Sequence, residues 1–263
     1  SPQQMFGAIA KTYYADKIGK NPENIVVVSV MPCTAKKYEA QRPEMNQHGI
    51  ADVDYVLTTR ELGRMIKQAG IDFRDLPDGI MDAPMGISSG AGDIFANTGG
   101  VMEAAIRTVY EVVTGRELPT NKLHIEPLMG LEGLKKASIT FTGTLPEWSF
   151  LEGIEVKVGV AHSLSHARRI LEAVNRGEEF HFIEVMTCAG GCIGGGGQPR
   201  YTDDSVRKKR INAIYQEDEG KKLRKSHENP QIKQIYEEFL GYPLGEKSHQ
   251  LLHTHYHSKN NTY

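Results

Sequence analysis

The chain has 263 residues, of which 39% are hydrophobic and 24% are charged, and its formal net charge at pH 7 is −2. These values are typical of a globular protein with one large or two modest domains, and they exclude the disordered and fibrous classes. The small net charge gives no argument for nucleic acid or an anionic membrane as a partner. No apolar run approaches the roughly 18 residues that a membrane helix needs.

The chain begins with a predicted helix and continues into a predicted buried strand. Ser1 and Pro2 are typical of a helix start, and an amphipathic pattern then extends to about Gly19. Residues 24–31 are almost continuously apolar and rich in β-branched side chains, which is typical of a strand buried on both faces in a parallel sheet. Cys33 follows this strand directly.

Further strands and helices are predicted downstream. Residues 52–59 alternate in polarity like a strand, and Thr58 and Glu61 have the spacing of a capping box at a helix start. Residues 98–115 predict a long helix that ends at a glycine. Other strands are expected at residues 122–130, 137–143, 154–162 and 180–186, and another helix at residues 165–177.

This alternation of strands and helices indicates an α/β fold, with largely parallel sheets covered by helices on both faces. From about residue 201 the strand pattern stops and the charge density rises, with eleven Lys and Arg against nine Asp and Glu in residues 201–263. We therefore expect a core domain in residues 1–200 and a helical extension in residues 201–263 that wraps this core.

Three cysteines, an odd number, argue against a disulfide framework and for a reducing compartment or a metal site. Cys188 and Cys192 follow the predicted strand of residues 180–186, as Cys33 follows its own strand. Chemistry in α/β folds lies at the carboxyl ends of strands, so these two distant segments can converge on one site.

The stretch "MTCAGGCIGGGGQP", residues 186–199, leaves several interpretations. Structural zinc usually has tighter cysteine pairs and four ligands. The glycines lack the Lys-Ser/Thr of a phosphate-binding loop and the strand-to-helix context of a dinucleotide fold. Iron–sulfur clusters are bulkier, and glycines let the backbone approach them closely, with positive φ where needed. Two buried cysteines beside a flexible loop remain the other interpretation.

Met31 and Lys36 flank Cys33. A lysine near a cluster supplies a charge-assisted donor for an anionic ligand, whereas its ordinary role is that of a solvated helix lysine. Methionines suit an apolar pocket for a desolvated metal group, whereas plain core packing is the other interpretation for Met31 and Met186.

Several segments together resemble one known family. Residues 31–39, "MPCTAKKYE", and residues 184–199, "EVMTCAGGCIGGGGQP", look like the second and third signature motifs of the iron-only, or [FeFe], hydrogenases. Further segments resemble the catalytic domain and the small-subunit-like C-terminal segment of that family, in the same order: residues 1–14, 58–62, 89–107 and 224–241. The resemblance therefore covers essentially the whole chain.

The resemblance implies the cofactor of that family, the H-cluster. Cys33, Cys188 and Cys192 would ligate a [4Fe–4S] cubane, and the Cys192 thiolate would also bridge to a diiron subsite that carries CO, cyanide and a bridging dithiolate. Lys36 would donate to a cyanide nitrogen, with Glu39 as its orienting partner. Other residues would pack against the diiron group or line its pocket: Met31, Met186, Phe95, Gln3 and Pro2.

By the same resemblance, the reaction would be the reversible reduction of protons to H2, by heterolytic chemistry at the diiron site. The partners would be the N-terminal part of the same protein and an electron carrier such as ferredoxin, reached through iron–sulfur domains. A non-catalytic iron–sulfur assembly factor related to hydrogenases and a low-turnover sensory hydrogenase are the alternatives. The pocket residues Met31, Lys36 and Met186 favour the enzyme over the assembly factor.

The first signature motif of the family, which has adjacent cysteines, would precede Ser1. We therefore expect the fourth cubane ligand and the proton-relay cysteine to lie before Ser1, and we expect activity only together with that N-terminal part. Because the opening residues have no signal-peptide pattern, we expect a cytoplasmic protein, with the periplasm as the alternative.

Overall fold

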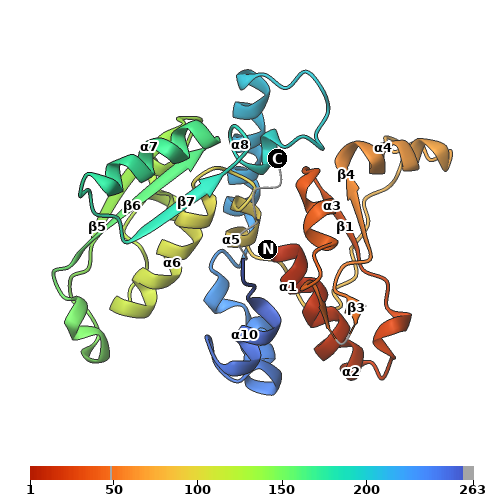
Figure 1. Cartoon of the computed structure of the whole chain (residues 1–263), viewed down its shortest axis with the longest axis horizontal. Helices are drawn as coiled ribbons and strands as arrows, with labels where there is room; N and C mark the ends of the chain where they lie inside the picture. The colour runs from red at the N-terminus through yellow and green to blue at the C-terminus, as the bar shows by residue number, and fades with distance from the viewer. Residues whose placement is uncertain (48, 257–263) are drawn as a thin grey trace. The chain divides into compact units, whose positions relative to one another are not determined.

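The computed structural model describes residues 1–47 and 49–256. Contacts divide the chain into two compact units (Figure 1). The first unit consists of Ser1–Gly86 and the chain from Pro230 onward, and the second unit consists of Ile87–Asn229. Each unit has hydrophobic clusters of its own, so each is built around its own core.

The first unit combines two small sheets with short helices. Its elements are α1 Pro2–Ile9, the π-helical η1 Ala10–Tyr14, α2 Ala15–Lys17, η2 Pro22–Asn24, β1 Val28–Met31, α3 Ala35–Ala40, β2 Asn46–Gln47, β3 Ile50–Ala51, β4 Tyr55–Thr58, α4 Thr59–Gln68, α9 Pro230–Ile235, the π-helical η8 Tyr236–Leu240 and α10 Glu246–Leu252.

The predicted early elements of the first unit are confirmed. The helix that begins at Pro2 continues through the π-helical turn η1. Strands β1 and β4 pair in parallel, with Met31 opposite Thr58, so both strands end at the same edge. The capping box is also confirmed: Thr58 Oγ1 accepts from the Glu61 N–H, and the Glu61 carboxylate accepts from the Thr58 N–H at 2.8 Å.

Among the described residues of the first unit, burial on the β1–β4 sheet is one-sided, which differs from the expectation of a strand covered on both faces. Val56 packs in a buried cluster that also contains Ala10 of η1. On β1, however, Val28 and Val30 are 51% and 43% exposed, and Tyr55 beside them on β4 is 63% exposed. An apolar sequence pattern predicts which strand can be buried, but it does not reveal whether a covering element is present.

The second unit is built around a three-stranded sheet. Its elements are α5 Gly90–Ile94, α6 Gly100–Thr114, η3 Asn121–Leu123, η4 Glu126–Leu128, β5 Leu134–Thr140, η5 Pro146–Leu151, β6 Glu155–His162, α7 Leu164–Asn175, β7 Phe182–Met186, η6 Cys192–Gly194, α8 Asp204–Gly220 and η7 Ser226–Glu228.

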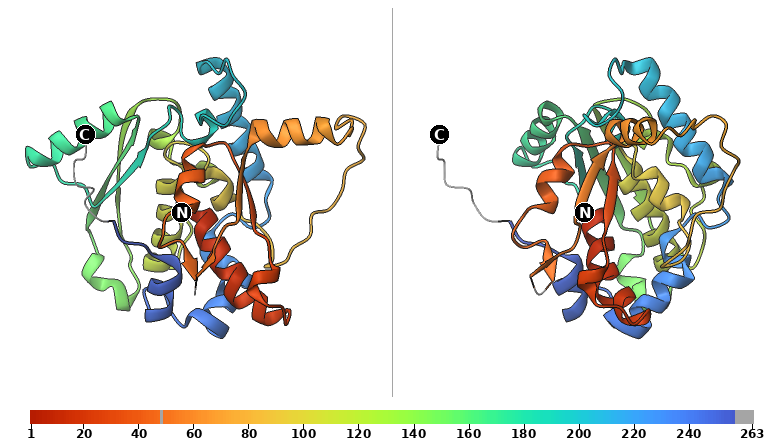
Figure 2. Two further views of the ribbon diagram at one scale, coloured as in Figure 1. Left: turned by 45° about the vertical axis from the view of Figure 1, so that its right-hand side comes forward. Right: turned by 90° about the vertical axis from the view of Figure 1, so that its right-hand side faces the viewer.

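The sheet of the second unit is mixed, with helices on both faces. Strand β7 is parallel to β6, whereas β5 is antiparallel to it. Val158 and Val160 of β6 pack against α6, while a Cβ on the intervening Gly159 would lie 2.3 Å from Ile170 of α7. The right-hand view of Figure 2 accordingly shows α6 and α7 on opposite sides of the strands. The α/β class and the two-sided covering are confirmed here, although the described sheets are smaller and less parallel than expected.

The strand expected at residues 122–130 is wrong, because this stretch forms the two short 3-10 helices η3 and η4. Lys122 and Leu123 have φ of 50° and 62°, which no strand residue adopts, and Pro127 has no N–H for a strand ladder. The apolar side chains of Leu123 and Leu128 are nevertheless buried. The apolar residues of this stretch therefore indicated burial in the core, and not a strand.

The C-terminal part of the chain is helical, as predicted, but it contributes to both units. Helix α8 belongs to the second unit, whereas α9, η8 and α10 belong to the first. The division into a core of residues 1–200 and an extension of residues 201–263 stays a prediction.

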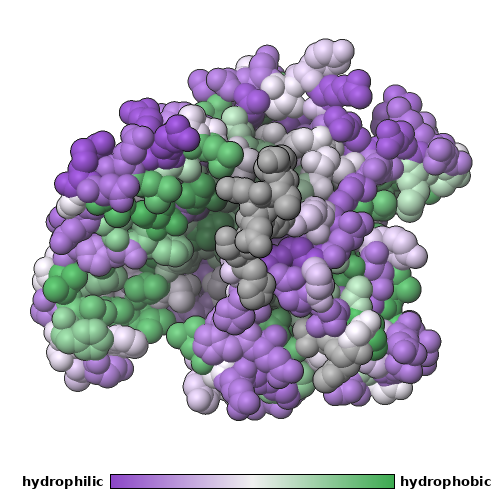
Figure 3. All heavy atoms as spheres, in the orientation of Figure 1, coloured by the Kyte–Doolittle hydropathy of each residue, from purple (hydrophilic) through white to green (hydrophobic). Residues whose placement is uncertain are grey.

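The surface of the second unit carries apolar side chains. They gather over β5–β7 and η5 in the view of Figure 3, and Val185 and Phe150 are 48% and 69% exposed.

None of the helices in the described part of the chain is both long and apolar enough to cross a membrane.

Candidate functional site

Cys33 lies in the turn between a parallel strand and a helix of the first unit. Strand β1 ends at Met31, Pro32 and Cys33 follow, and Thr34 is the N-cap of α3. The Cys33 side chain is partly exposed and forms no disulfide. The sequence prediction that Cys33 follows the carboxyl end of a strand is therefore confirmed.

Three of the predicted site residues in the first unit form one hydrogen-bonded group. Gln3 of α1 is 6% exposed, and its Oε1 accepts from Ser29 Oγ of β1 at 2.7 Å. Its Nε2 donates to the Lys36 carbonyl at 3.1 Å. Lys36 Nζ in turn donates to Glu39 Oε2 at 2.7 Å. The predicted pairing of Lys36 with Glu39 is thus present in the structure.

The Lys36–Glu39 pair is partly shielded from water. The two side chains are 28% and 16% exposed. Burial by itself would raise the pKa of Glu39, but hydrogen bonds from Lys36 Nζ and Ser1 Oγ outweigh it and hold that pKa below its ordinary value. Glu39 is therefore a carboxylate at neutral pH, and it fixes the Lys36 ammonium group on α3. Met31 is partly buried against the Val56 cluster, whereas Pro2 is exposed.

In the second unit, the other two cysteines lie in a tight loop after β7. The strand ends at Met186, and η6 begins at Cys192. Gly190 and Gly191 have φ of 80° and 90°, a region that only glycine adopts readily. A Cβ on Gly191 would lie 2.9 Å from Met186 Sδ, so the Met186 thioether packs directly against the loop. Positive φ therefore occurs between the cysteines, at two positions where the chain has glycine.

The segment of residues 95–98 is hydrogen-bonded to this loop through its backbone. The Thr98 N–H donates to the Gly190 carbonyl at 3.0 Å, and the Ile193 N–H donates to the Ala96 carbonyl at 3.1 Å. Phe95, another predicted site residue, packs in the same cluster as Ile193. The structure thus brings Phe95, Met186 and the loop of Cys188 and Cys192 into one neighbourhood.

Two buried polar side chains beside the loop have unused hydrogen-bonding capacity. Asn97 and Thr98 are each 1% exposed. Neither the amide atoms of Asn97 nor Thr98 Oγ1 has a partner among the described residues. Buried polar groups are normally paired in native proteins. These atoms therefore mark a place where a bound group with acceptor or donor atoms would fit.

Sequence reasoning missed three buried titratable residues in the second unit. Glu184 of β7, Lys135 of β5 and His162 of β6 are only 6%, 2% and 6% exposed. Burial raises the pKa of Glu184 and lowers that of Lys135 to about 8. A charged residue inside the otherwise apolar strand "FIEVM" was the available signal, because such a residue needs a buried partner.

The three cysteines are distributed over both units, Cys33 in the first and Cys188 with Cys192 in the second. Within residues 1–47 and 49–256, no group of three or more His, Cys, Asp or Glu side chains is arranged to hold a metal ion. The joint ligand set of Cys33, Cys188 and Cys192 therefore stays a prediction.

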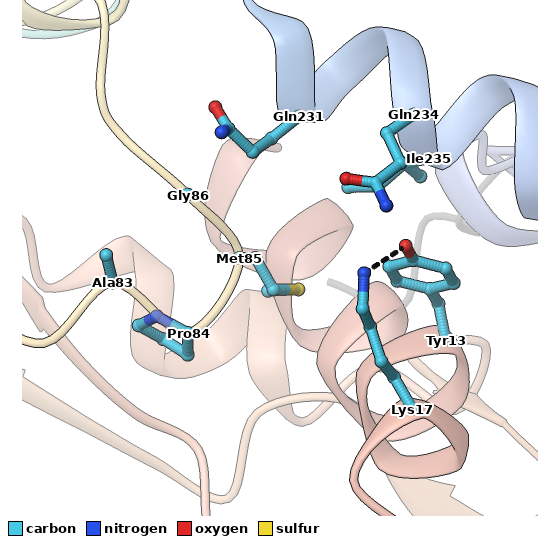
Figure 4. Close-up of a pocket in the computed structure, with 9 residues that line it drawn as sticks. All are labelled: Tyr13, Lys17, Ala83, Pro84, Met85, Gly86, Gln231, Gln234 and Ile235. Atoms are coloured by element: carbon cyan, nitrogen blue, oxygen red, sulfur yellow. Dashed lines mark hydrogen bonds between the residues drawn. The ribbon is translucent and has the colours of Figure 1, made fainter.

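A separate cavity of about 230 Å³ lies within the first unit (Figure 4). Tyr13 and Lys17 form one wall, where Lys17 Nζ donates to the Tyr13 hydroxyl at 3.0 Å. Met85 and Gln234 also line the cavity. None of the predicted site residues lines this cavity.

Comparison with known families agrees with both cysteine segments and with the C-terminal helices. The family described as "Iron only hydrogenase large subunit, C-terminal domain" matches residues 1–196. The family described as "Iron hydrogenase small subunit" matches residues 204–259. This chain belongs to the iron-only hydrogenase family.

Curated hydrogenases match nearly the whole chain. The NADP-reducing hydrogenase subunit HndD of Solidesulfovibrio fructosivorans is 56% identical over 257 residues, which are 97% of this chain and 42% of that protein. Iron hydrogenase 1 of Clostridium pasteurianum is 40% identical over 263 residues, covering 97% of this chain and 44% of that protein. This chain thus spans less than half the length of these two hydrogenases.

A solved hydrogenase structure shares the fold, and a non-hydrogenase relative is more distant. An apo [FeFe]-hydrogenase HydA1 from Chlamydomonas reinhardtii aligns with a TM-score of 0.83 and 42% identity, over 97% of this chain and 68% of that one. The cytosolic Fe-S cluster assembly factor narfl of Danio rerio is 26% identical over 272 residues, covering 100% of this chain and 62% of that protein.

Proposed function

We propose that this chain is part of the catalytic domain of an [FeFe] hydrogenase, which interconverts protons, electrons and H2. The single observation that carries the proposal is the Lys36–Glu39 pair at the helix after Cys33, held by Gln3. A fixed ammonium group on the helix that follows a cysteine, three residues after it in the sequence, suits an anionic, thiolate-bound cofactor. Membership of the hydrogenase family supports the same activity.

The proposed cofactor is a [4Fe–4S] cubane linked to a diiron subsite with CO, cyanide and a bridging dithiolate. Cys33, Cys188 and Cys192 would hold the cubane, and Cys192 would also bridge to the diiron subsite. The buried amide of Asn97, which has no partner among the described residues, supports a bound group beside the cysteine loop of the second unit. When bound, this cofactor supplies the open iron site at which H2 is split heterolytically.

The protein's own residues would orient the cofactor and exclude water from it. Glu39 holds the Lys36 ammonium group, and the N–H groups not bound to Glu39 would donate to a cyanide nitrogen of the cofactor. Met31, Met186 and Phe95 would provide apolar, polarisable walls, and Gln3 and Pro2 would complete the lining. A water-poor pocket strengthens the Lys36 hydrogen bond and protects a low-valent metal group.

Two other functions differ from this one at the same residues. An assembly factor would keep cubane cysteines without a diiron pocket, but Met31, Lys36 and Met186 are all present here. A low-turnover sensory hydrogenase would retain the full pocket and differ in rate. The partners of the proposed enzyme are the N-terminal part of the same protein and an electron carrier such as ferredoxin. We place the enzyme in the cytoplasm, with the periplasm as the alternative.

The bridging role of Cys192 is tested by Cys192→Ser in the full-length, matured protein. We expect loss of hydrogen evolution and of the infrared bands of iron-bound CO and cyanide, while part of the cubane is still assembled. Electron paramagnetic resonance (EPR) of the reduced protein measures the cubane. Cys188→Ser is the comparison variant, because Cys188 would ligate the cubane without bridging to the diiron subsite. Unchanged diiron occupancy in Cys192→Ser would rule out Cys192 as the bridge.

A further inference from the structure

Gly190, midway between Cys188 and Cys192, is held at both of its backbone groups. Its carbonyl accepts from the Thr98 N–H at 3.0 Å. Its N–H donates to His162 Nδ1 at 3.3 Å. His162 is the last residue of β6 and lies opposite Met186 in the parallel pairing with β7, so its ring reaches the loop that follows β7.

The His162 ring is suited to be an acceptor. It is 6% exposed, and burial lowers its pKa, with further lowering by the nearby cation Lys135. A neutral imidazole has one nitrogen without a proton, and only that nitrogen can accept the Gly190 N–H. A second imidazole, that of His166, packs edge-on against the His162 ring, with 5.8 Å between the ring centroids. His166 forms its own hydrogen bond to the nearby Ser163 hydroxyl.

Thr98, the second support of Gly190, is itself fixed by Lys135. The Lys135 ammonium group donates to the Thr98 carbonyl at 2.8 Å and to the Gly130 carbonyl at 3.1 Å. Lys135 is 2% exposed, so few water molecules compete for these bonds. One residue, Thr98, therefore connects the buried lysine of β5 to the loop between the cysteines.

Glu184 fixes the next residues of the same segment. Lys135, Val160 and Glu184 are neighbours across β5, β6 and β7, and this row faces α6. The Glu184 carboxylate accepts from the N–H groups of Gly99 and Met102 at 2.7 and 2.8 Å, at the amino end of α6. A carboxylate is stabilised there by the helix dipole, and it compensates the buried charge of Lys135.

We propose that His162 and Lys135 are positioning residues for the cluster-binding loop. They hold the backbone of Gly190, His162 directly and Lys135 through Thr98, and thereby set the orientation of the Cys188 and Cys192 thiolates. This inference rests on the proposed function, because it assumes that these thiolates bind iron. Neither residue is assigned contact with the cofactor.

The arrangement has a consequence for the reduction potential of the cubane. Backbone N–H groups that point at cluster sulfurs stabilise the reduced, more negative cluster and raise its potential. In this structure the Gly190 N–H donates to His162 Nδ1. Removing the His162 acceptor frees this N–H to donate to a cluster sulfur, so we expect a more positive cubane potential. The loop also loses one of its supports, so we expect the cluster to be held less firmly.

The test compares His162→Leu with His162→Asn in the full-length holoprotein. Asn Oδ1 can replace His Nδ1 as an acceptor, whereas Leu cannot. The measurements are the midpoint potential of the cubane from an EPR-monitored redox titration and the rate of iron loss to a chelator. We expect His162→Leu to shift the potential upward and to lose iron about five-fold faster, the factor for one net hydrogen bond. His162→Asn should resemble the wild type in both.

A matched control separates positioning from general destabilisation. His124 is similarly buried in the same unit, but its ring contacts Glu103 and Glu219 rather than the cysteine loop. His124→Leu should lower the stability of the unit without moving the cubane potential. Equal potential shifts in His124→Leu and His162→Leu, or no shift in His162→Leu, would overturn the proposal.

Lys135 provides an independent pair of variants if His162→Leu does not retain a cluster. Lys135→Met should change the cubane potential and accelerate iron loss, whereas Lys135→Arg, which can still donate to Thr98, should restore the wild-type values in part. Identical behaviour of the two Lys135 variants would overturn the proposal. Absence of CO and cyanide bands from the wild type would instead refute the proposed hydrogenase function. The cubane potentials of the variants test the positioning proposal separately, so the two outcomes can be told apart.

Discussion

Lys36 is restrained at its side chain by Glu39 and at its backbone by Gln3. Glu39 holds its ammonium group at 2.7 Å, one turn along the same helix, while 28% of the Lys36 side chain remains exposed. The ion pair therefore fixes the direction of the side chain and still leaves N–H donors for another anion. Gln3 adds a bond to the Lys36 backbone, so both ends of the residue are restrained.

We predict that Lys36→Ala weakens retention of the diiron subsite roughly ten- to a hundred-fold, the range for one hydrogen bond to a charged group. The infrared intensity of the CO and cyanide bands after dialysis measures this retention. Lys37→Ala is the matched control, because Lys37 lies on the same helix and pairs with Glu61 instead. Full retention and full activity in Lys36→Ala would count against its assigned role.

Lys135 predicts a specific pH dependence of stability. Burial lowers its pKa to about 8, whereas the unfolded chain keeps the ordinary value of 10.5. Between these values the unfolded state binds more protons, so the free energy of unfolding rises with pH from about 8 to 10.5, by up to about 3 kcal/mol. Denaturant unfolding at several pH values should show this rise in the wild type and not in Lys135→Met. Parallel profiles for the two proteins would contradict it.

The sequence predicts some of these residues well and others not at all. Cys33, Lys36 and Glu39 lie within seven consecutive positions, so their neighbourhood follows from local helix geometry. The link to the cysteine loop depends on tertiary contacts for Asn97, His162 and Lys135. The sequence around each of these residues does not predict those contacts. The buried Glu184 was detectable as a charge in an apolar strand, but its partners at the amino end of α6 were not.

At the scale of elements, the carboxyl ends of parallel strands position both cysteine segments. Strand β1 delivers Cys33, and β7 delivers Cys188 and Cys192. These strands and most helices could be predicted from their periodicity. The 3-10 helices at residues 121–128 could not, because positive φ at Lys122 and Leu123 depends on the packing around them.

Helices α6 and α8 of the second unit are joined by buried charges. Arg107 on α6 binds Asp218 on α8 and Glu103 on its own helix, and all three side chains are fully buried. Burial would raise the pKa of Asp218, but hydrogen bonds from Arg107 and Arg224 hold it below its ordinary value. The carboxylate therefore stays charged and keeps α8 against α6.

We predict that Asp218→Ala lowers the free energy of unfolding by about 3–5 kcal/mol, because it leaves a buried arginine short of a partner. Glu217→Ala is the control on the same helix, since that side chain is 61% exposed in its pair with Lys221 and should change stability by less than about 1 kcal/mol. Denaturant titration of both variants gives the comparison. A small effect of Asp218→Ala would show that the buried pair is dispensable for α8 docking.

At the scale of the whole molecule, the three cysteines of the proposed ligand set belong to different units. The first unit contributes Cys33, and the second contributes Cys188 and Cys192. A cubane takes four ligands, so three cysteines leave one position to be filled by another residue. The chain spans less than half the length of the curated hydrogenases that it matches, and the proposed activity belongs to the full-length protein.

The most direct test of the account is infrared spectroscopy of the full-length, matured protein under anaerobic conditions. A diiron subsite carries CO and cyanide, whose stretching bands lie in a region where proteins absorb little. We predict bands of both ligands, which shift when H2 is added. A matured protein that has an EPR-active [4Fe–4S] cluster but no CO or cyanide bands would contradict the hydrogenase account and favour the assembly factor.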